Sequence, residues 1–404
     1  MKILFLCHRF PYPPKRGGKI RPFNIIRHLA RSHDVHVVSL VRSPEEAREG
    51  EGLRQFCSQY AMGRVRNGVQ WLRMVARVPT LSPSSMGYFY SPEVERHVRG
   101  ALGIERFDLI FVHCSSVAQY VKHVQDTPKL LDFGDMDSQK WREYARFKPF
   151  PLSRCYALEA WKLERAEKQL ARQFDLCTCT TRAELETLQR FGTGAPTAWF
   201  PNGVDAGYFT PSDEAYEPDT IAFVGRMDYY PNQECMLEFC STTLPLIRAR
   251  RPGVRLLIVG AEPSRAIQRL ANIQGVTVTG SVPDVRPYVR RAALMVAPLR
   301  IARGTQNKIL EAMAMGVPVV ASRCAAGGVD AIDREHLLTA STAAETAAAV
   351  DAILSDALLR QRLSLAGRER MLSHHAWDKS MRRLDDIVDR CVAMHARRDA
   401  LQAA

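Results

Sequence analysis

Short, continuously apolar runs alternate along this chain with longer segments of mixed polarity. In the first 200 residues the runs predict buried strands at 1–7, 33–40, 107–113, 130–138 and 174–181. Helices are expected between them, at about 20–31 and at 153–172. Strands that are apolar on both faces and alternate with helices indicate a parallel sheet with helices on both sides.

The second half of the chain repeats this alternation. Strands are expected at 220–224, 256–259, 276–279, 294–297 and 317–321. Helices are expected at 232–248 and at 307–315, which is made of good helix formers. Gly316 follows the second of these helices at the position where a glycine commonly ends a helix.

The length of 404 residues suits two domains, each long enough to bury its own core. Pro201 and an Asn-Gly turn at 202–203 separate the two strand-helix series. We therefore predict an N-terminal domain at 1–200 and a C-terminal domain at 201–376.

Composition excludes several classes of protein. No apolar run approaches the roughly 18 to 20 residues that a membrane-spanning helix needs. Residues 1–7 are too short for a signal peptide, so we expect them to form a first strand. The ten cysteines form no Cys-x-x-Cys pair, so we expect free thiols and no metal site.

Positive charge is concentrated in the first half of the chain. The net charge is +13; residues 1–200 hold 31 Lys or Arg against 20 Asp or Glu, whereas the remainder holds 25 against 23. This surplus suits contact with an anionic membrane, a lipid-linked diphosphate or a nucleic acid, and a solvated basic surface explains it equally well. No nucleic-acid-binding module is recognisable, so we expect no nucleic-acid partner.

Residues 53–78 interleave apolar side chains with arginines and predict a basic amphipathic helix. The apolar set includes Trp71 and Leu72, and such a helix can lie in a membrane interface. The interpretation we favour is an ordinary helix whose apolar side packs on the sheet.

Two groups near strand ends in the first half are candidates for ligand binding. Gly17 and Gly18 lie between a strand and a helix, where the backbone can come close to a phosphate or a sugar. They do not form the Gly-x-Gly-x-x-Gly fingerprint, which counts against a dehydrogenase. His113 ends a strand at the edge where parallel sheets bind ligands.

The run at 130–138 ends a strand in three carboxylates, Asp132, Asp135 and Asp137. Two of them, Asp135 and Asp137, have the spacing of a divalent-metal pair, as in transferases that hold a nucleotide through a metal. We favour substrate contact or loop capping near the same sheet edge. Together with Lys140 they are assigned to the acceptor side, and no metal is expected.

The segment 298–322 predicts a loop, a helix and a strand in immediate succession. Lys308 and Glu311 are three residues apart, so both lie on one face of the first helical turns. The free amides of the loop at Gly304 and Thr305 point the same way. This combination of cation, carboxylate and amides suits a ligand that carries both phosphate and hydroxyl groups.

Gly225 and Arg226 end the first strand of the second half. A guanidinium at this position can reach a phosphate. Together with Lys308 and the loop amides, it predicts a convergent anion site.

These motifs, in this order, resemble the family-4 retaining glycosyltransferases of the two-domain GT-B fold. The matching pieces are Gly17-Gly18, His113, the linker at 202–205, Gly225-Arg226 and the stretch 307–322. The resemblance covers essentially the whole chain. It implies an α/β protein with two Rossmann-like parallel-sheet domains facing a central cleft, and a C-terminal helix at 377–404 that packs back on the first domain. The run 135–141 looks like the branch associated with exosortase (PEP-CTERM) exopolysaccharide loci.

The resemblance also implies a role for the matching residues. Arg226 and Lys308 would hold the donor diphosphate, and Glu311 would bind the ribose hydroxyls of the nucleotide. His113 would contact the donor sugar or its phosphate. The implied donor-binding set is Gly17, Gly18, Gly225, Arg303, Gly304, Thr305, Asn307 and Glu311.

The chain departs from the family pattern at two positions. The usual pair of glutamates eight apart would require a glutamate at 303, where Arg303 stands, so the sugar-binding carboxylate is missing. The lysine often found a few residues after the glycine-arginine pair is also missing, and Asn232 occupies that neighbourhood.

The function implied by the resemblance is metal-independent sugar transfer with retention of configuration. The expected partners are a nucleotide-sugar co-substrate and a glycan or polyprenyl-diphosphate-linked acceptor, with no further cofactor. The expected place is the cytoplasm, with peripheral contact at the inner face of the membrane, in exopolysaccharide biosynthesis. Two alternatives stay open: a nucleotide-sugar epimerase or hydrolase of the same fold, and a metal-dependent transferase using Asp135 and Asp137.

Overall fold

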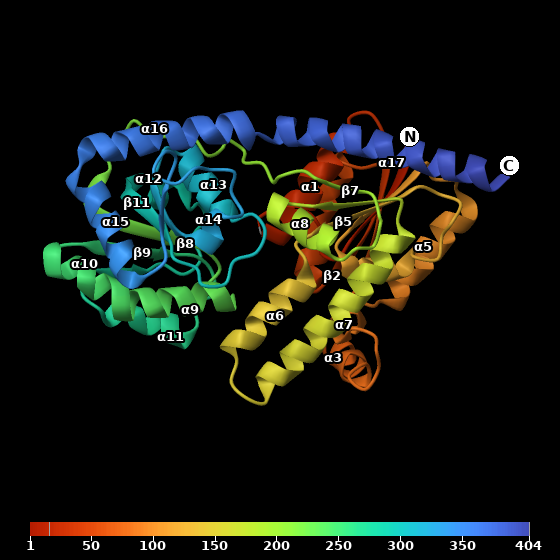
Figure 1. The fold of residues 1–404 in the computed structure, drawn as a ribbon, viewed down its shortest axis with the longest axis horizontal. Helices are drawn as coiled ribbons and strands as arrows, with labels where there is room; N and C mark the ends of the chain where they lie inside the picture. The colour runs from red at the N-terminus through yellow and green to blue at the C-terminus, as the bar shows by residue number, and fades with distance from the viewer. Residues whose placement is uncertain (16, 404) are drawn as a thin grey trace. The chain divides into compact units, whose positions relative to one another are not determined.

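The computed structural model describes residues 1–15 and 17–403, which form two compact units. The first unit contains Met1–Pro201 and the segment from Met381 onward, and the second contains Asn202–Ser380. Each unit is built on one parallel β-sheet (Figure 1). Within the described residues, no helix combines the length and apolar character needed to cross a bilayer.

The first unit has a seven-stranded sheet in the order β3-β2-β1-β4-β5-β6-β7. The strands are β1 (Lys2–Cys7), β2 (Asp34–Val41), β3 (Gln59–Arg64), β4 (Leu109–His113), β5 (Lys129–Gly134), β6 (Leu176–Cys179) and β7 (Thr197–Trp199). Every residue of the central strands β1, β4 and β5 is buried except Lys2. Helices cover both faces of these strands, which explains their continuously apolar sequences.

The helices of the first unit are α1 (Gly17–Leu29), α2 (Pro44–Gly50), α3 (Asn67–Ala76), α4 (Ser84–Tyr88), α5 (Pro92–Ile104), α6 (Asp137–Phe147), α7 (Leu152–Gln173) and α8 (Arg182–Arg190). Two 3-10 turns, Glu51–Gln55 and Ser115–Tyr120, complete the connections. The helix predicted at 153–172 is confirmed as α7.

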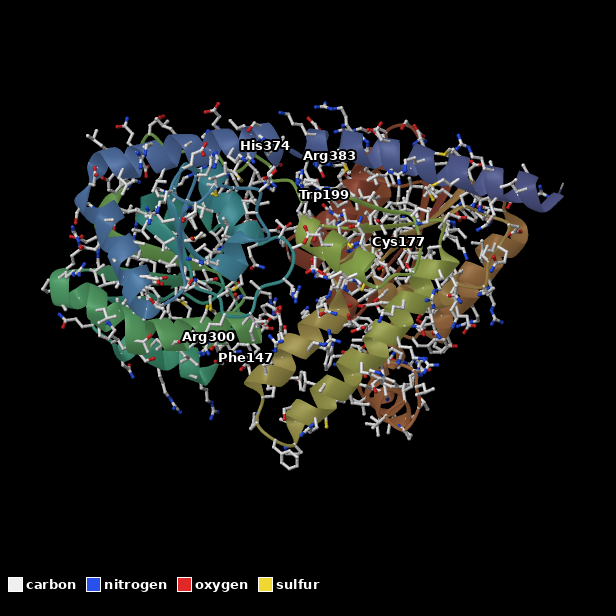
Figure 2. All side chains as sticks on the ribbon, viewed as in Figure 1. Phe147, Cys177, Trp199, Arg300, His374 and Arg383 are labelled. Atoms are coloured by element: carbon white, nitrogen blue, oxygen red, sulfur yellow. The ribbon has the colours of Figure 1, made fainter. Side chains whose placement is uncertain are left out.

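The long terminal helix α17 (Trp377–Ala403) belongs to the first unit from Met381 onward. Arg398 Nη1 and His395 Nδ1 lie 2.7 and 3.2 Å from Asp175 Oδ1. The guanidinium of Arg383 lies 5.0 Å from the ring centroid of Trp199 (Figure 2). These contacts join the end of the chain to the loop before β6 and to β7.

The second unit has a six-stranded parallel sheet in the order β10-β9-β8-β11-β12-β13. The strands are β8 (Glu217–Val224), β9 (Arg255–Val259), β10 (Val276–Val278), β11 (Ala292–Ala297), β12 (Val319–Ser322) and β13 (Leu338–Ala340). The helices are α9 (Tyr230–Glu238), α10 (Leu244–Arg250), α11 (Arg265–Arg269), α12 (Arg286–Arg291), α13 (Asn307–Ala314), α14 (Arg323–Ala326), α15 (Ala343–Ser355) and α16 (Ala357–His374). The predicted fold of two Rossmann-like parallel-sheet domains is confirmed.

The helix predicted at 232–248 is interrupted. A π-helical turn at Phe239–Thr243 separates α9 from α10. Pro245 lies in the first turn of α10, where it has no N–H to continue the α-helical hydrogen bonds. Proline and π-type turns are usual causes of such a break.

The single helix predicted at 53–78 is wrong. Residues 59–64 form the edge strand β3, whose Tyr60 pairs with Val37 of β2, and only Asn67–Ala76 is helical. Gly63 explains the difference, because a Cβ at this position would lie 2.4 Å from a Val94 side-chain carbon. A glycine that allows such close approach fits an edge strand better than a helix interior.

Candidate active site

The loop, helix and strand predicted at 298–322 are confirmed. The loop follows β11, and Gly304 within it has a φ of 59°, a left-handed conformation that suits glycine. Helix α13 then begins at Asn307 and ends at Ala314. Gly316, with a φ of 71°, donates its N–H to the Met313 carbonyl at 2.9 Å and turns the chain toward β12.

Lys308 lies in the first turn of α13 and is partly buried. Its ammonium donates to Asn232 Oδ1 at 2.7 Å and lies 4.4 Å from the ring centroid of Phe223. Asn232 Nδ2 in turn donates to the Arg226 carbonyl at 2.8 Å. Burial lowers the pKa of Lys308 to about 8. Asn232 therefore connects the start of α13 to the end of β8.

Gly225 is the close neighbour of this pair. A Cβ on Gly225 would lie 2.6 Å from Asn232 Nδ2 and 3.1 Å from Lys308 Nζ. The absence of a side chain at 225 is what lets both polar groups approach the backbone at the carboxyl end of β8. Ligands of parallel sheets bind at this edge.

Glu311 lies one turn after Lys308 on the same helix. Burial raises the pKa of Glu311 to about 7, although the charge of Lys308 acts in the opposite direction. The pair thus places a cation and a hydrogen-bond acceptor in a region of low polarity, where each interacts strongly with a polar ligand.

Arg226 follows Gly225 in sequence, and its guanidinium is directed to two carboxylates. Its Nε and Nη2 donate to Asp228 at 2.9 and 2.7 Å, and Nη2 also lies 2.5 Å from Glu262 Oε2. Hydrogen bonding to Asp228 raises the pKa of Arg226 above its ordinary value. The sequence did not predict Glu262 as a partner, because it is 36 residues away.

The remaining donor-side residues surround the start of α13. The Arg303 carbonyl accepts a hydrogen bond from Gln306 Nε2 at 3.1 Å. Asn307 Oδ1 accepts from Asn202 Nδ2 at 3.3 Å. The Thr305 hydroxyl oxygen is buried and has no hydrogen-bond partner among the described residues. It is a polar group that a ligand could satisfy.

The first unit carries a second group of predicted residues at the carboxyl ends of β4 and β5. His113 Nδ1 lies 2.8 Å from Asp132 Oδ2. Asp132 is completely buried and also accepts from Arg21 Nε at 2.8 Å and from Thr178 Oγ1 at 2.9 Å. Burial alone would raise the pKa of Asp132, but Arg21 and His113 hold it below its ordinary value.

The His113 site depends on two residues that sequence reasoning missed. The sequence assigned a role to neither Asp132 nor Arg21. The signal for Asp132 is the register of the sheet, in which His113 pairs with Asp132. That pairing could have been found only after β4 and β5 had been placed side by side.

Gly17 and Gly18 lie in the first turn of α1 rather than in a loop before it. The helix predicted from residue 20 thus starts at Gly17. A Cβ on Gly18 would lie 3.2 Å from Arg9 Cδ, so the glycine lies close to the loop after β1.

The predicted acceptor-side residues belong to the end of β5 and the start of α6. Asp135 Oδ1 accepts from Thr180 Oγ1 at 3.0 Å, and Asp137 Oδ2 lies 3.8 Å from Cys114 Sγ. Burial raises the pKa of Asp137, while Lys140 in the same helix acts against this shift. Among the described residues, no three metal-ligating side chains gather.

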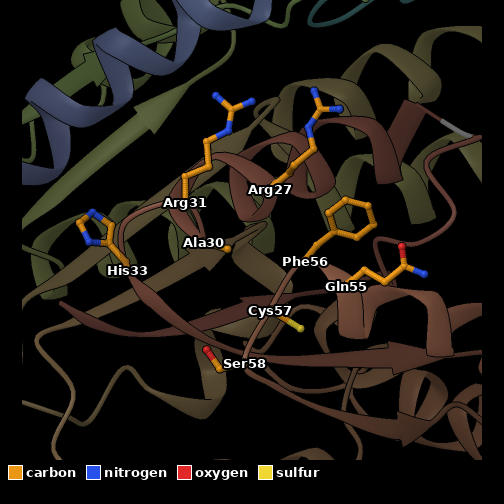
Figure 3. A pocket seen from close by; sticks show the side chains of 8 residues that line it. All are labelled: Arg27, Ala30, Arg31, His33, Gln55, Phe56, Cys57 and Ser58. Carbon is orange, nitrogen blue, oxygen red and sulfur yellow. The ribbon is translucent and has the colours of Figure 1, made fainter.

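A hollow of about 440 Å³ in the first unit lies away from these groups (Figure 3). Its lining includes His33, which precedes β2, and Ser58, which precedes β3. The hollow therefore lies at the amino ends of the strands, whereas His113 is at a carboxyl end. Its other lining residues are Arg27, Ala30, Arg31, Gln55, Phe56 and Cys57.

Comparison with known proteins shows that each half of the chain is similar to a glycosyltransferase family. Residues 16–208 match the family described as Glycosyltransferase Family 4, and residues 218–356 match Glycosyl transferases group 1. A GDP-mannose-dependent α-(1-6)-phosphatidylinositol monomannoside mannosyltransferase of Mycobacterium tuberculosis is 27% identical over 224 residues, 49% of this chain and 57% of the relative. A glycogen synthase of the same organism is 26% identical over 234 residues, 55% of this chain and 54% of the relative. The chain thus aligns with a little over half the length of these curated relatives.

Solved structures share the fold over nearly the whole chain. A sucrose-phosphate synthase from Thermosynechococcus elongatus superposes with a TM-score of 0.72 at 16% identity, over 97% of this chain and 99% of that one. HepE of Anabaena, in complex with UDP-glucose, gives a TM-score of 0.69 at 15% identity, over 96% and 99%. At these identities the likeness concerns the fold alone.

Proposed function

We propose that this chain, which carries a family 4 and a group 1 glycosyltransferase domain, transfers a sugar from a nucleotide-sugar to a glycan or lipid-linked acceptor with retention of configuration. The observation that carries the proposal is the group formed by Lys308, Asn232 and Glu311 beside Gly225. It combines a desolvated cation with a carboxylate at the carboxyl edge of a parallel sheet. A nucleoside diphosphate has the phosphate and ribose hydroxyls that suit these two groups, and one relative is named as GDP-mannose-dependent.

Departure of the nucleoside diphosphate is the demanding step, because negative charge develops as the glycosidic bond breaks. Lys308 and the amides at the start of α13 are fixed before the reaction and face that charge. Arg226 would exchange Asp228 and Glu262 for diphosphate oxygens as the donor binds. Glu311 would accept hydrogen bonds from the ribose hydroxyls.

Retention follows, in our proposal, from attack of the acceptor on the same face that the phosphate leaves. The departing phosphate accepts the proton of the acceptor hydroxyl, so no side chain is assigned as nucleophile. Lys308 and Arg226 supply the positive charge that a metal supplies in other transferases. We therefore propose that turnover is insensitive to EDTA, and loss of activity in EDTA would favour the metal-dependent alternative with Asp135 and Asp137.

We also propose binding roles for residues of the first unit. His113, oriented by Asp132, would contact the donor sugar or its phosphate through the nitrogen that Asp132 does not bind. Gly17 and Gly18 would approach the donor through the backbone. Asp135, Asp137 and Lys140 would contact the acceptor. We place the reaction in cytoplasmic exopolysaccharide biosynthesis, the process associated with the branch that the sequence resembles.

The test begins with nucleotide-sugars screened for thermal stabilisation, since a ligand of the folded state raises the melting temperature. Turnover of the stabilising donor is then measured with a polyprenyl-diphosphate-linked sugar as acceptor. One charge-assisted contact contributes about 1.5–3 kcal/mol, so Lys308→Ala and Arg226→Ala are each expected to lose one to two orders of magnitude in turnover. Arg269→Ala, on an exposed part of α11, is the matched control.

Wild-type turnover in both variants would overturn the site assignment. Release of free sugar or nucleotide at the same rate with and without acceptor would identify the epimerase or hydrolase alternative instead.

A further inference from the structure

Helix α3 packs on the first unit with its polar side chains. Gln70 is 2% exposed, and its Nε2 donates to the Tyr90 carbonyl at 3.0 Å. Arg73 Nη1 donates to the same carbonyl at 2.8 Å, and its guanidinium lies 5.1 Å from the Tyr90 ring. The prediction that the apolar side of this segment packs on the sheet is therefore wrong.

The apolar side chains of α3 face solvent instead. Trp71 is 57% exposed, Leu72 72% and Val75 58%. We call the exposed set on α3 and the segment after it the apolar face: Val69, Trp71, Leu72, Val75, Val78 and Leu81. A surface helix of a globular protein normally shows the reverse arrangement, so this contiguous apolar face indicates a partner.

Hydrogen bonds from α7 hold the segment that follows α3. Lys162 Nζ donates to the carbonyls of Arg77 and Val78 at 3.1 and 2.7 Å. Glu159, also on α7, accepts hydrogen bonds from the N–H groups of Ser84 and Ser85 at 2.9 and 2.8 Å. These bonds fix both ends of the segment that follows α3. Val78 and Leu81 of this segment are therefore exposed in the folded protein.

The surroundings of the apolar face are cationic. Residues 52–92 contain five arginines and no Asp or Glu. A hollow of about 240 Å³ beside Leu81 is lined by Arg77, Lys122 and Arg165. The nearest carboxylate on α7, Glu159, is 6% exposed and is occupied by the two serine amides. An anionic partner is therefore complementary to this surface.

We propose that the apolar face inserts into the interface of an anionic phospholipid membrane, with the arginines and the hollow meeting lipid phosphates. Tryptophan and leucine on one side of a helix with basic residues nearby suit the boundary between headgroups and acyl chains. A second copy of the chain fits poorly, because a two-fold contact would bring the arginines of the two copies together. The inference goes beyond the proposed function and does not depend on the donor site.

Flotation of the full chain with lipid vesicles tests the inference. We expect binding to vesicles of equal parts phosphatidylcholine and phosphatidylglycerol, weaker binding to phosphatidylcholine alone, and loss of binding as salt is raised. The double variant Trp71→Glu with Leu72→Glu is expected to lose at least tenfold in binding. Its melting temperature should stay at the wild-type value, since both side chains are exposed.

The matched control is Leu358→Glu with Leu365→Glu, which changes two exposed leucines of α16 in the other unit and should bind as wild type does. Equal vesicle binding by the two double variants would overturn the inference. So would equal binding of the wild type to neutral and anionic vesicles. If the Trp71 and Leu72 variant instead converts a dimer to a monomer in light scattering with vesicle binding unchanged, the face is an interface between copies.

Discussion

At the scale of single residues, Gly225 makes the sharpest test of the donor site. A Cβ there would displace Asn232 Nδ2 and Lys308 Nζ, which lie 2.6 and 3.1 Å from its ideal position. We expect Gly225→Ala to weaken nucleotide-sugar binding by about one to two orders of magnitude, since loss of one charge-assisted contact costs about 1.5–3 kcal/mol. Isothermal titration calorimetry measures the effect. Gly253→Ala is the control because a Cβ there meets nothing within 4 Å, and equal affinity in both variants would contradict the packing argument.

The pKa values of two residues on α13 predict a narrow pH range for donor binding. Lys308, with a pKa of about 8, loses its positive charge as the pH rises above that value. Glu311, with a pKa of about 7, loses its negative charge as the pH falls below that value. Both charged forms coexist mainly between the two values, so we expect donor affinity to be highest at about pH 7–8 and to fall on either side.

Two variants test the acid and the alkaline decrease in donor affinity separately. Lys308→Arg should remove the alkaline fall, because a guanidinium stays charged throughout the range. Glu311→Gln should remove the acid fall, because an amide oxygen accepts hydrogen bonds at any pH. A wild-type affinity that is flat between about pH 6 and 9 would contradict the assignment of both residues.

At the scale of elements, the glycine that follows α13 is expected to affect stability, whereas the residues at the start of this helix are expected to affect donor binding. Gly316 has a φ of 71°, a conformation that costs other residues about 1–2 kcal/mol. We expect Gly316→Ala to lower the free energy of unfolding by about this amount while leaving donor affinity unchanged, since Lys308 lies at the opposite end of the helix. Urea unfolding measures the free energy of unfolding, and calorimetric titration measures the donor affinity. Gly327→Ala, at a φ of −61°, should change neither.

Elements whose signal is local could be predicted from the sequence. The apolar runs of β1 and β4 and the loop, helix and glycine around α13 were predicted because each depends on adjacent residues. The prediction for residues 53–78 was wrong in two respects. It missed β3, and the apolar and basic pattern, which fits α3, does not say which side of that helix faces the protein. Gln70 and Arg73 face inward only because the Tyr90 carbonyl, a distant group, accepts their hydrogen bonds.

In the candidate site, too, the contacts between residues close in sequence could be predicted, whereas those between distant residues could not. Lys308 and Glu311 lie together through helical spacing alone. Asp132 and Arg21 are 111 residues apart, and Arg226 and Glu262 are 36 apart. Such pairs depend on strand order and loop position, which no local pattern specifies.

At the scale of the whole molecule, the chain leaves the first unit at Pro201 and rejoins it at Met381. Asp175 holds the returning helix through Arg398 and His395. We expect Asp175→Asn to weaken this attachment and to speed tryptic cleavage within α17 several-fold under native conditions. Limited proteolysis followed by mass spectrometry measures the rate. Asp389→Asn, at an exposed position of α17, is the control, and equal cleavage rates would show that Asp175 does not hold the helix.

The lowered pKa of Lys308 has a chemical consequence as well. A lysine that titrates near pH 8 is an uncharged amine for half of the time at that pH, and an uncharged amine is a nucleophile toward acylating reagents. Lys129 also titrates near 8, but it is fully buried, whereas Lys308 is only half-buried. Lys308 is therefore a natural attachment point for a covalent probe at mildly alkaline pH, and a bound nucleotide-sugar would protect it from labelling.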